Sequence, residues 1–200
     1  KPDYAVKACK NVGWSDDLIN KTKFVDTGAD AIKLNEVEVV IEATGFPAAG
    51  IEHARQAFQN GKHIIMVNVE ADVLAGAALA KEANSVGVVY SMAYGDQPAL
   101  TAEIVEWARA SGFNVTSAGK GTRYQPIYHK SSPDTVWDYY GLTHEEARKA
   151  GMNPKMFNSF LDGTKSGLEM AAIANACDLE VPTNGLLFPP CGMDDLANIL

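Results

Sequence analysis

Residues 37–68 read VEVVIEATGFPAAGIEHARQAFQNGKHIIMVN and contain two short apolar runs on either side of a helix-like segment. The first run, Val37–Thr44, is apolar enough to be a strand covered on both faces. A turn with glycine and proline leads into the helix-like segment, which we expect to end at Gly61. The second run, His63–Asn68, is the next predicted strand. This segment therefore predicts one strand–helix–strand unit.

The same alternation continues along the chain. The further elements predicted are, in order, a helix over 71–87, a strand over 86–94, a helix over 96–112 and a strand over 114–119. Strands separated by helices of this length are typical of a parallel sheet with right-handed crossovers. We therefore expect an α/β fold, with a partial Rossmann-type parallel sheet in a dinucleotide-binding domain over residues 1–118.

The second part of the chain, residues 119–200, loses this periodicity. It opens with an irregular segment rich in proline, glycine and aromatic residues, which we expect to form a long functional or interface loop. Thr143 and Glu146 have the spacing of a helix capping box. A longer helical segment, 153–177, is expected to break around Asp162–Gly163. We predict an α+β catalytic and dimerisation region here.

Composition narrows the function classes. No apolar run in the 200 residues approaches the roughly 18 that a membrane span requires. The 25 acidic residues exceed the 17 basic ones, which disfavours a nucleic-acid surface. Three widely spaced cysteines, Cys9, Cys177 and Cys191, fit neither a disulfide scaffold nor a CxxC metal site. We expect a soluble, cytoplasmic protein with no membrane or nucleic-acid partner.

Polar residues at the strand ends are the first candidate site, because parallel sheets bind ligands beyond the carboxyl ends of their strands. The cofactor-binding candidates are Thr44, Gly45, Phe46, Pro47, Asn68, Val69 and Glu70. Those for substrate binding are Tyr94, Gly95 and Asp96, and Lys120 in the GKGT segment follows another strand end. The alternatives are an ordinary tight turn after Thr44 and a solvated loop lysine at 120. No GxGxxG fingerprint is present in the chain.

A second candidate site is the helix that contains Lys165 and Glu169, four residues apart and therefore on one face. Asp162 lies close before them. Charges on a helix otherwise rich in alanine and methionine are costly to bury unless paired, and such groups often act as acids or bases. The alternative is an exposed ion pair. Asp96, Asp162 and Glu169 could hold a divalent ion if they converge, and the sequence leaves this metal question open.

Several segments of the chain resemble two known families. VVIEATGFPAAGIEHARQAFQNGKHIIMVN is similar to the nucleotide-binding domain of homoserine dehydrogenases, in which one strand ends in Thr-Gly and the next, after GKH, in Asn. The segments VNVEADVL, GDQPAL, AGKGT, SSPDTVWDYYGLT, AGMNPKMFNSFLDGTKS and FPPCGMDDL more closely resemble the deoxyxylulose-phosphate reductoisomerase-like proteins, a related group. This resemblance covers most of the chain from residue 37 onward.

The resemblance implies an NADP-dependent oxidoreductase, with NAD left open, that works as a homodimer or higher homo-oligomer. It also implies that a glycine-rich first βα unit precedes Lys1 and a small domain follows Leu200. The implied reaction converts 1-deoxy-D-xylulose 5-phosphate to 2-C-methyl-D-erythritol 4-phosphate in isoprenoid biosynthesis. Lys165 would polarise the carbonyl or transfer the proton and Glu169 would orient it, while Asp162 and Lys120 would position the small-molecule substrate.

Two departures separate the chain from homoserine dehydrogenases. Val69 follows the strand-end Asn68 where those enzymes have a lysine, and Lys165 precedes Glu169 where they have the acidic residue first. A cation in place of a carboxylate suits a phosphate or carboxylate on the substrate better than an amino group. Homoserine dehydrogenase and a branched sugar-acid dehydrogenase remain the enzymatic alternatives. A nucleotide-sensing or oligomerisation module without turnover is the alternative from another class.

Overall fold

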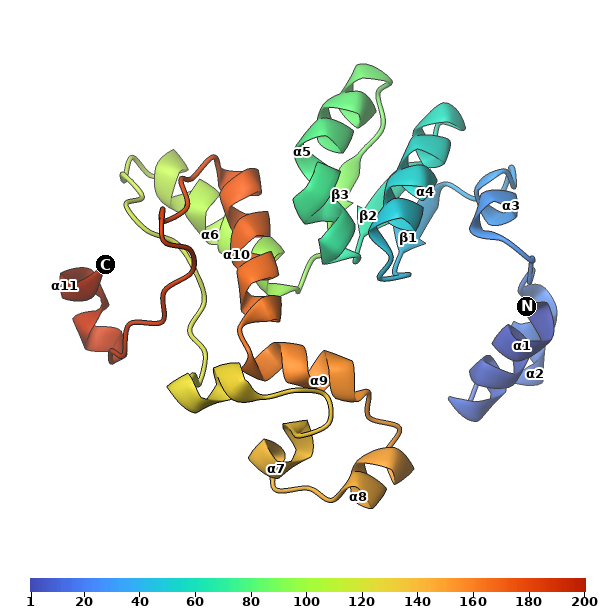
Figure 1. The fold of residues 1–200 in the computed structure, drawn as a ribbon. Coiled ribbons are helices and arrows are strands. Elements are labelled where there is room, and N and C mark those ends of the chain that lie inside the picture. The colour runs from blue at the N-terminus through green and yellow to red at the C-terminus, as the bar shows by residue number, and fades with distance from the viewer. The chain divides into compact units, whose positions relative to one another are not determined.

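The computed structural model describes residues 1–200, which form two compact units, Lys1–Ser91 and Met92–Leu200 (Figure 1). Unit 1 contains most of the sheet, and unit 2 is built almost entirely of helices and irregular segments. The domain boundary predicted near residue 118 lies inside unit 2 and stays a prediction. None of the helices combines the length and apolarity that crossing a membrane requires.

Unit 1 confirms the predicted alternation of strands and helices. Its elements are α1 (Pro2–Asn11), α2 (Asp16–Lys21), α3 (Gly28–Ile32), β1 (Val39–Glu42), α4 (Pro47–Gln59), β2 (His63–Met66), α5 (Val69–Ser85) and β3 (Tyr90–Met92). The strand order is β1-β2-β3, and β1 runs parallel to β2 with Val39 opposite His63. The fold is therefore α/β with a small sheet, as the sequence predicts.

Helix α4 ends where the sequence indicates but begins at Pro47, inside the GFPAAG segment that was expected to be a turn before the helix. Pro47 occupies the first turn, where its missing N–H would have no helical partner in any case. Beyond the C-cap Asn60, Gly61 takes a positive φ of 66°, which a residue without a side chain adopts at little cost. One apolar cluster joins α4, β2 and α5, and its buried members from these elements are Ala54, Ala57, Phe58, Ile64, Met66, Ala71, Leu79 and Ala83.

Strand β1 corrects the expectation that it is covered on both faces. Val40 packs against the apolar cluster, but Val39 and Ile41 are 48% and 68% exposed. Successive side chains of a strand point to opposite faces of the sheet, and α4 and α5 both pack on the face that carries Ile64 and Met66. The other face of β1 is therefore open in this structure.

Unit 2 corrects two further expectations. Its elements after β3 are α6 (Gln97–Ala110), a 3₁₀ turn η1 (Pro126–Lys130), α7 (Val136–Tyr140), α8 (His144–Lys149), α9 (Pro154–Leu161), α10 (Thr164–Cys177), a second 3₁₀ turn η2 (Met193–Asp195) and α11 (Leu196–Ile199). Residues 114–119 form no strand, because they pack as an irregular segment: Val115 and Ala118 contact the apolar cluster of α6 and α10. Residues 119–200 contain no strand, so the α+β prediction for this region is wrong.

Local signals in unit 2 are confirmed. Thr143 and Glu146 form the capping box of α8, in which the Thr143 N–H donates to Glu146 Oε2 at 2.8 Å and the Glu146 N–H to Thr143 Oγ1 at 3.2 Å. The predicted break around Asp162–Gly163 separates α9 from α10. Gly163 there has a positive φ of 89°, and Asp162 Oδ1 accepts the Thr164 N–H at 2.9 Å. The chain therefore turns sharply before α10.

Gly50→Ala should destabilise unit 1 by about 1–3 kcal/mol, the usual range for overpacking a tight core. An added Cβ at Gly50 would lie 2.7 Å from Ala71 Cβ and 2.8 Å from Asn68 Nδ2. Urea unfolding followed by circular dichroism measures the change. Gly167→Ala is the control, because nothing lies within 4 Å of its added Cβ. Equal unfolding midpoints for Gly50→Ala and the wild type would contradict the packing.

Candidate functional site

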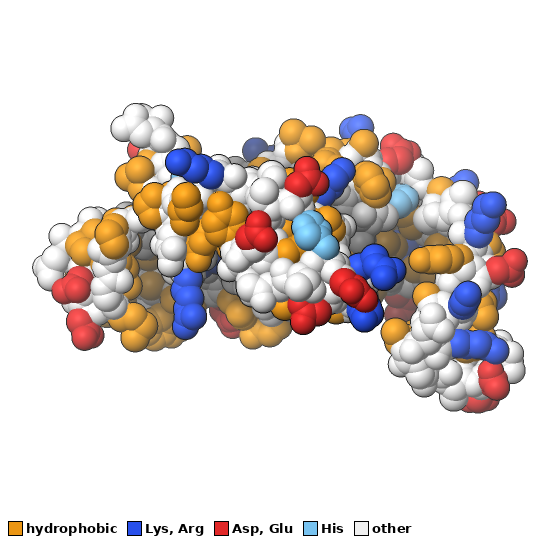
Figure 2. Space-filling view, turned by 60° about the horizontal axis from the view of Figure 1, so that its bottom comes forward, with side chains coloured by type: hydrophobic (Ala, Val, Ile, Leu, Met, Phe, Trp, Pro, Cys, Tyr) orange, Lys and Arg blue, Asp and Glu red, His pale blue; other side chains and the backbone are white.

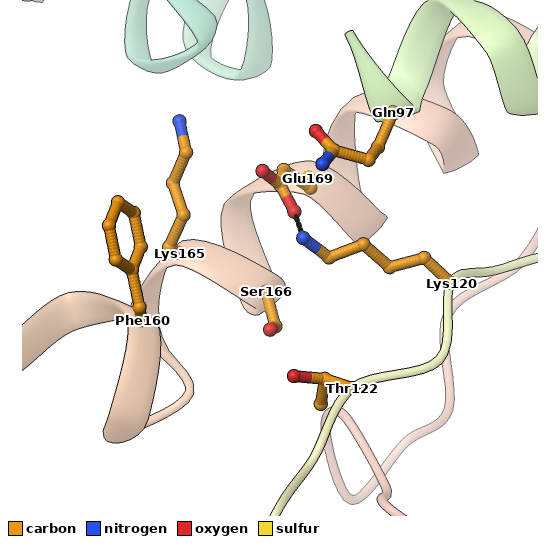
Figure 3. A pocket seen from close by; sticks show the side chains of 7 residues that line it. All are labelled: Gln97, Lys120, Thr122, Phe160, Lys165, Ser166 and Glu169. Atoms are coloured by element: carbon orange, nitrogen blue, oxygen red, sulfur yellow. Dashed lines mark ion pairs between the residues drawn. The ribbon is translucent and has the colours of Figure 1, made fainter. Parts of the chain in front are cut away.

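Unit 2 contains a polar pocket at the junction of its helices (Figure 3). Helix α10 and the segment that follows Gly119 contribute most of it, with one side chain each from α6 and α9. The lining residues are Gln97, Lys120, Thr122, Phe160, Lys165, Ser166 and Glu169. Three of the four residues predicted to be catalytic, Lys120, Lys165 and Glu169, therefore lie together.

Glu169 is the most buried charged group in this pocket, with 3% of its surface exposed. Its Oε2 forms an ion pair with the Lys120 ammonium (Figure 3). A buried carboxylate without a cation would be strongly destabilising. The ion pair with Lys120 therefore offsets the cost of burying Glu169 on this largely apolar helix. Glu169 thus pairs with Lys120 across the pocket, whereas the sequence suggested its helix neighbour Lys165.

Opposing effects act on the charge of Lys120, since the ion pair with Glu169 favours the ammonium whereas burial and a like charge disfavour it. Burial lowers the pKa of the Lys120 ammonium, the nearby positive charge of Lys165 lowers it further, and Asp96 opposes both effects. Lys165 takes part in none of the ion pairs in the structure, and its side chain extends away from the Lys120–Glu169 pair (Figure 3). The pocket therefore holds two lysines and one carboxylate.

The other predicted residues of unit 2 lie outside the pocket lining. Asp162 Oδ2 accepts a hydrogen bond from Asn158 Nδ2 at 2.9 Å, and its other oxygen is bonded to the first turn of α10, so it orders the helix junction. Asp96 caps α6 by accepting the Gln97 N–H at 3.0 Å. Tyr94 is 80% exposed. The structure brings no three acidic, histidine or cysteine side chains into a metal-binding cluster, so a divalent-ion site at Asp96, Asp162 and Glu169 gains no support.

Unit 1 joins its two strand ends through Asn68. The Asn68 Nδ2 group donates to Glu42 Oε2 at 2.9 Å and to the Phe46 carbonyl at 3.0 Å, while its Oδ1 accepts the Ala71 N–H and caps α5. His53 Nδ1 lies 3.2 Å from Glu42 Oε1. The side chain of Asn68 thus links the two strand ends, and its role in cofactor binding stays a prediction.

Glu42 is a residue that the sequence reasoning missed. It is 2% exposed at the end of β1. Burial alone would raise the pKa of its carboxyl group, but hydrogen bonds from Thr44, Asn68 and His53 outweigh burial and leave the pKa below its ordinary value. A glutamate inside an otherwise apolar run was the available signal, because a buried acid in a strand needs donors around it.

The turn after β1 is the part of unit 1 that remains free to bind a ligand. Thr44, Gly45 and Phe46 are exposed, and α4 has neither a side-chain cap nor an acidic residue in its first turn. Such an uncapped 13-residue helix offers backbone N–H groups to an anion such as a dinucleotide phosphate. The residues present thus fit a nucleotide cofactor, whereas Val69 is buried in the core side of α5.

An α/β unit with an open turn at the carboxyl end of a parallel strand is typical of nucleotide-binding folds. The family model described as oxidoreductase DRL, catalytic domain, matches residues 95–200, more than half of the chain and every residue of the pocket. The chain therefore belongs to this oxidoreductase family and is an enzyme of that class. No curated protein matches it.

Lys120→Met should destabilise unit 2 by about 3–5 kcal/mol, because it leaves Glu169 buried without a cation. The double variant Lys120→Met/Glu169→Gln removes that charge and should regain most of the loss. Urea unfolding followed by tryptophan fluorescence measures the two variants in the Trp14→Phe background, in which the remaining tryptophans, Trp107 and Trp137, both lie in unit 2. A double variant as unstable as the single one would show that the ion pair does not stabilise the site.

Lys165→Met should raise the pKa of Lys120, because it removes the like charge that holds this pKa down. Competitive acetylation of lysines over a pH series, read by mass spectrometry, reports the pKa of Lys120. The exposed Lys155 supplies the control variant Lys155→Met. A Lys120 titration that is the same in all three proteins would contradict the coupling.

Proposed function

We propose that the protein is an NADP-dependent reductase or reductoisomerase of a small polyhydroxylated, phosphorylated substrate. The first candidate is 1-deoxy-D-xylulose 5-phosphate, converted to 2-C-methyl-D-erythritol 4-phosphate in isoprenoid biosynthesis. The observation that carries the proposal is the buried Lys120–Glu169 pair beside the unpaired Lys165. Two cations and one carboxylate suit an anionic substrate that must also be protonated.

Lys120 is the proposed proton donor. Its lowered pKa brings the ammonium closer to the range in which it can release a proton at neutral pH. Glu169 holds that ammonium in the pocket through the ion pair. This assignment exchanges the roles expected from the sequence, because Glu169 contacts Lys120 and not Lys165.

Lys165 is the proposed binding group for the anionic part of the substrate. It lines the pocket without an acidic partner, so its charge is available to a phosphate or carboxylate. An amino-acid substrate such as aspartate semialdehyde brings a cation of its own, which this pair of lysines would repel. The pocket therefore favours a sugar phosphate over the substrate of a homoserine dehydrogenase.

The cofactor would be held by the exposed turn Thr44–Pro47 and the first amides of α4. When bound, a reduced nicotinamide dinucleotide supplies the hydride. NADP is preferred over NAD because the resemblance to the reductoisomerase-like proteins implies it. The homodimer or higher homo-oligomer that the resemblance also implies stays a prediction, as does the cytoplasmic location.

A non-catalytic sensing module is less consistent with the site. Such a module would tolerate Lys165 and Glu169 facing solvent, whereas both line the pocket and Glu169 is buried. The deciding assay is NADPH oxidation by the whole protein with deoxyxylulose phosphate and, in parallel, with aspartate semialdehyde. Turnover of the first supports the proposal. Turnover of only the second would make the protein a homoserine dehydrogenase, and turnover of neither would reject both.

Steady-state kinetics of two lysine variants should separate the proposed roles. Lys120→Arg should lower kcat about a hundredfold or more, since it keeps a cation beside Glu169 but removes the proton donor. Lys165→Ala should chiefly raise KM for the phosphorylated substrate. Lys155→Ala is the control outside the pocket. A kcat/KM for Lys165→Ala within about threefold of the wild type would reject a substrate contact at this residue.

A further inference from the structure

Ser166 carries a pocket-lining hydroxyl for which the protein supplies no hydrogen-bond partner. It lies in the first turn of α10 and is 6% exposed. A serine in a helix commonly donates to the carbonyl four residues earlier, but the Ser166 side chain forms no such bond here. The Ser166 hydroxyl oxygen is not among the fully buried side-chain atoms that lack a partner, so it opens to the pocket and is available to a ligand.

The Ser166 hydroxyl faces the part of the pocket that Thr122 lines. Figure 3 shows the Ser166 side chain directed toward Thr122, with the Lys120–Glu169 pair on its other side. Lys165 extends the other way. The same pocket thus holds an ammonium and two hydroxyls, each of which can donate a hydrogen bond to a bound ligand.

We propose that Ser166 is a further catalytic residue, whose hydroxyl donates to the substrate carbonyl oxygen together with Lys120. The proposal rests on the reductase function proposed above. As hydride from a reduced nicotinamide cofactor adds to the carbonyl carbon, the C=O π electrons move to the oxygen. That oxygen takes a proton from the Lys120 ammonium, which becomes a neutral amine, and the cofactor is left oxidised. Ser166 keeps its proton and stabilises the developing negative charge.

Thr122 is a weaker candidate for the same task. Its side chain is exposed on an irregular segment, so water competes for its hydroxyl. Ser166 is fixed on a 14-residue helix and only 6% of the residue is exposed, which favours a preorganised donor. The pocket therefore assigns the main role to Ser166.

Kinetics of Ser166→Ala in the whole protein, with NADPH and deoxyxylulose phosphate, tests the assignment. We expect kcat to fall by about a hundredfold, the usual loss for one such donor, with KM changed far less. Ser166→Thr retains the hydroxyl and should recover most of kcat. Ser159→Ala is the matched control, because Ser159 donates to the Met156 carbonyl on α9 and does not line the pocket.

The outcomes distinguish the two proposals. No NADPH oxidation by the wild type would overturn the reductase function on which the inference rests. Turnover by the wild type with a Ser166→Ala kcat within about threefold of it would overturn the role of Ser166 alone. A lower kcat that accompanies a lower urea midpoint and is not recovered by Ser166→Thr would also overturn it, since that combination indicates a packing role.

Discussion

A carboxylate buried on a helix of mostly small apolar residues is tolerated only when a cation reaches it, and Lys120 is that cation for Glu169. The segment that carries Lys120 has no regular secondary structure, so the ion pair is one of the contacts that hold this segment against α10. The same contact places an ammonium with a lowered pKa beside Lys165 and Ser166. The local stability of this region and the chemistry of its pocket thus depend on one interaction.

Unit 1 also contains a buried carboxylate, which is stabilised by hydrogen bonds and not by a lysine or arginine. Glu42 is buried at the end of β1. The Asn68 side chain and the Thr44 backbone N–H donate hydrogen bonds to its carboxylate, and His53 Nδ1 lies close to the same group. This network fixes the start of α5 relative to the end of β1. Hydrogen bonds to Glu42 and Asn68 hold the turn Thr44–Phe46 in place, while its residues remain exposed to solvent. A rigid base with an accessible backbone is the arrangement that nucleotide-binding turns require.

The sequence predicted what local patterns control. The alternation of strands and helices over residues 37–110, the capping box at Thr143 and the break at Gly163 all follow from short-range signals. Pairing across the fold was not predictable in the same way. Glu169 was expected to act on Lys165 from helix spacing, but Lys120, 49 positions earlier, reaches it instead. The strand expected over 114–119 failed for the same reason, because strands need partners that a single segment does not reveal.

The open face of β1 has a consequence for handling the protein. Val39 and Ile41 expose apolar surface on a strand at the edge of the sheet, next to a row of backbone groups without a neighbouring strand. Edges of this kind promote association between molecules. Within residues 1–200, this strand is therefore a site where another strand or molecule can add, and a charged residue in place of Ile41 would disfavour such association while leaving the packed face untouched.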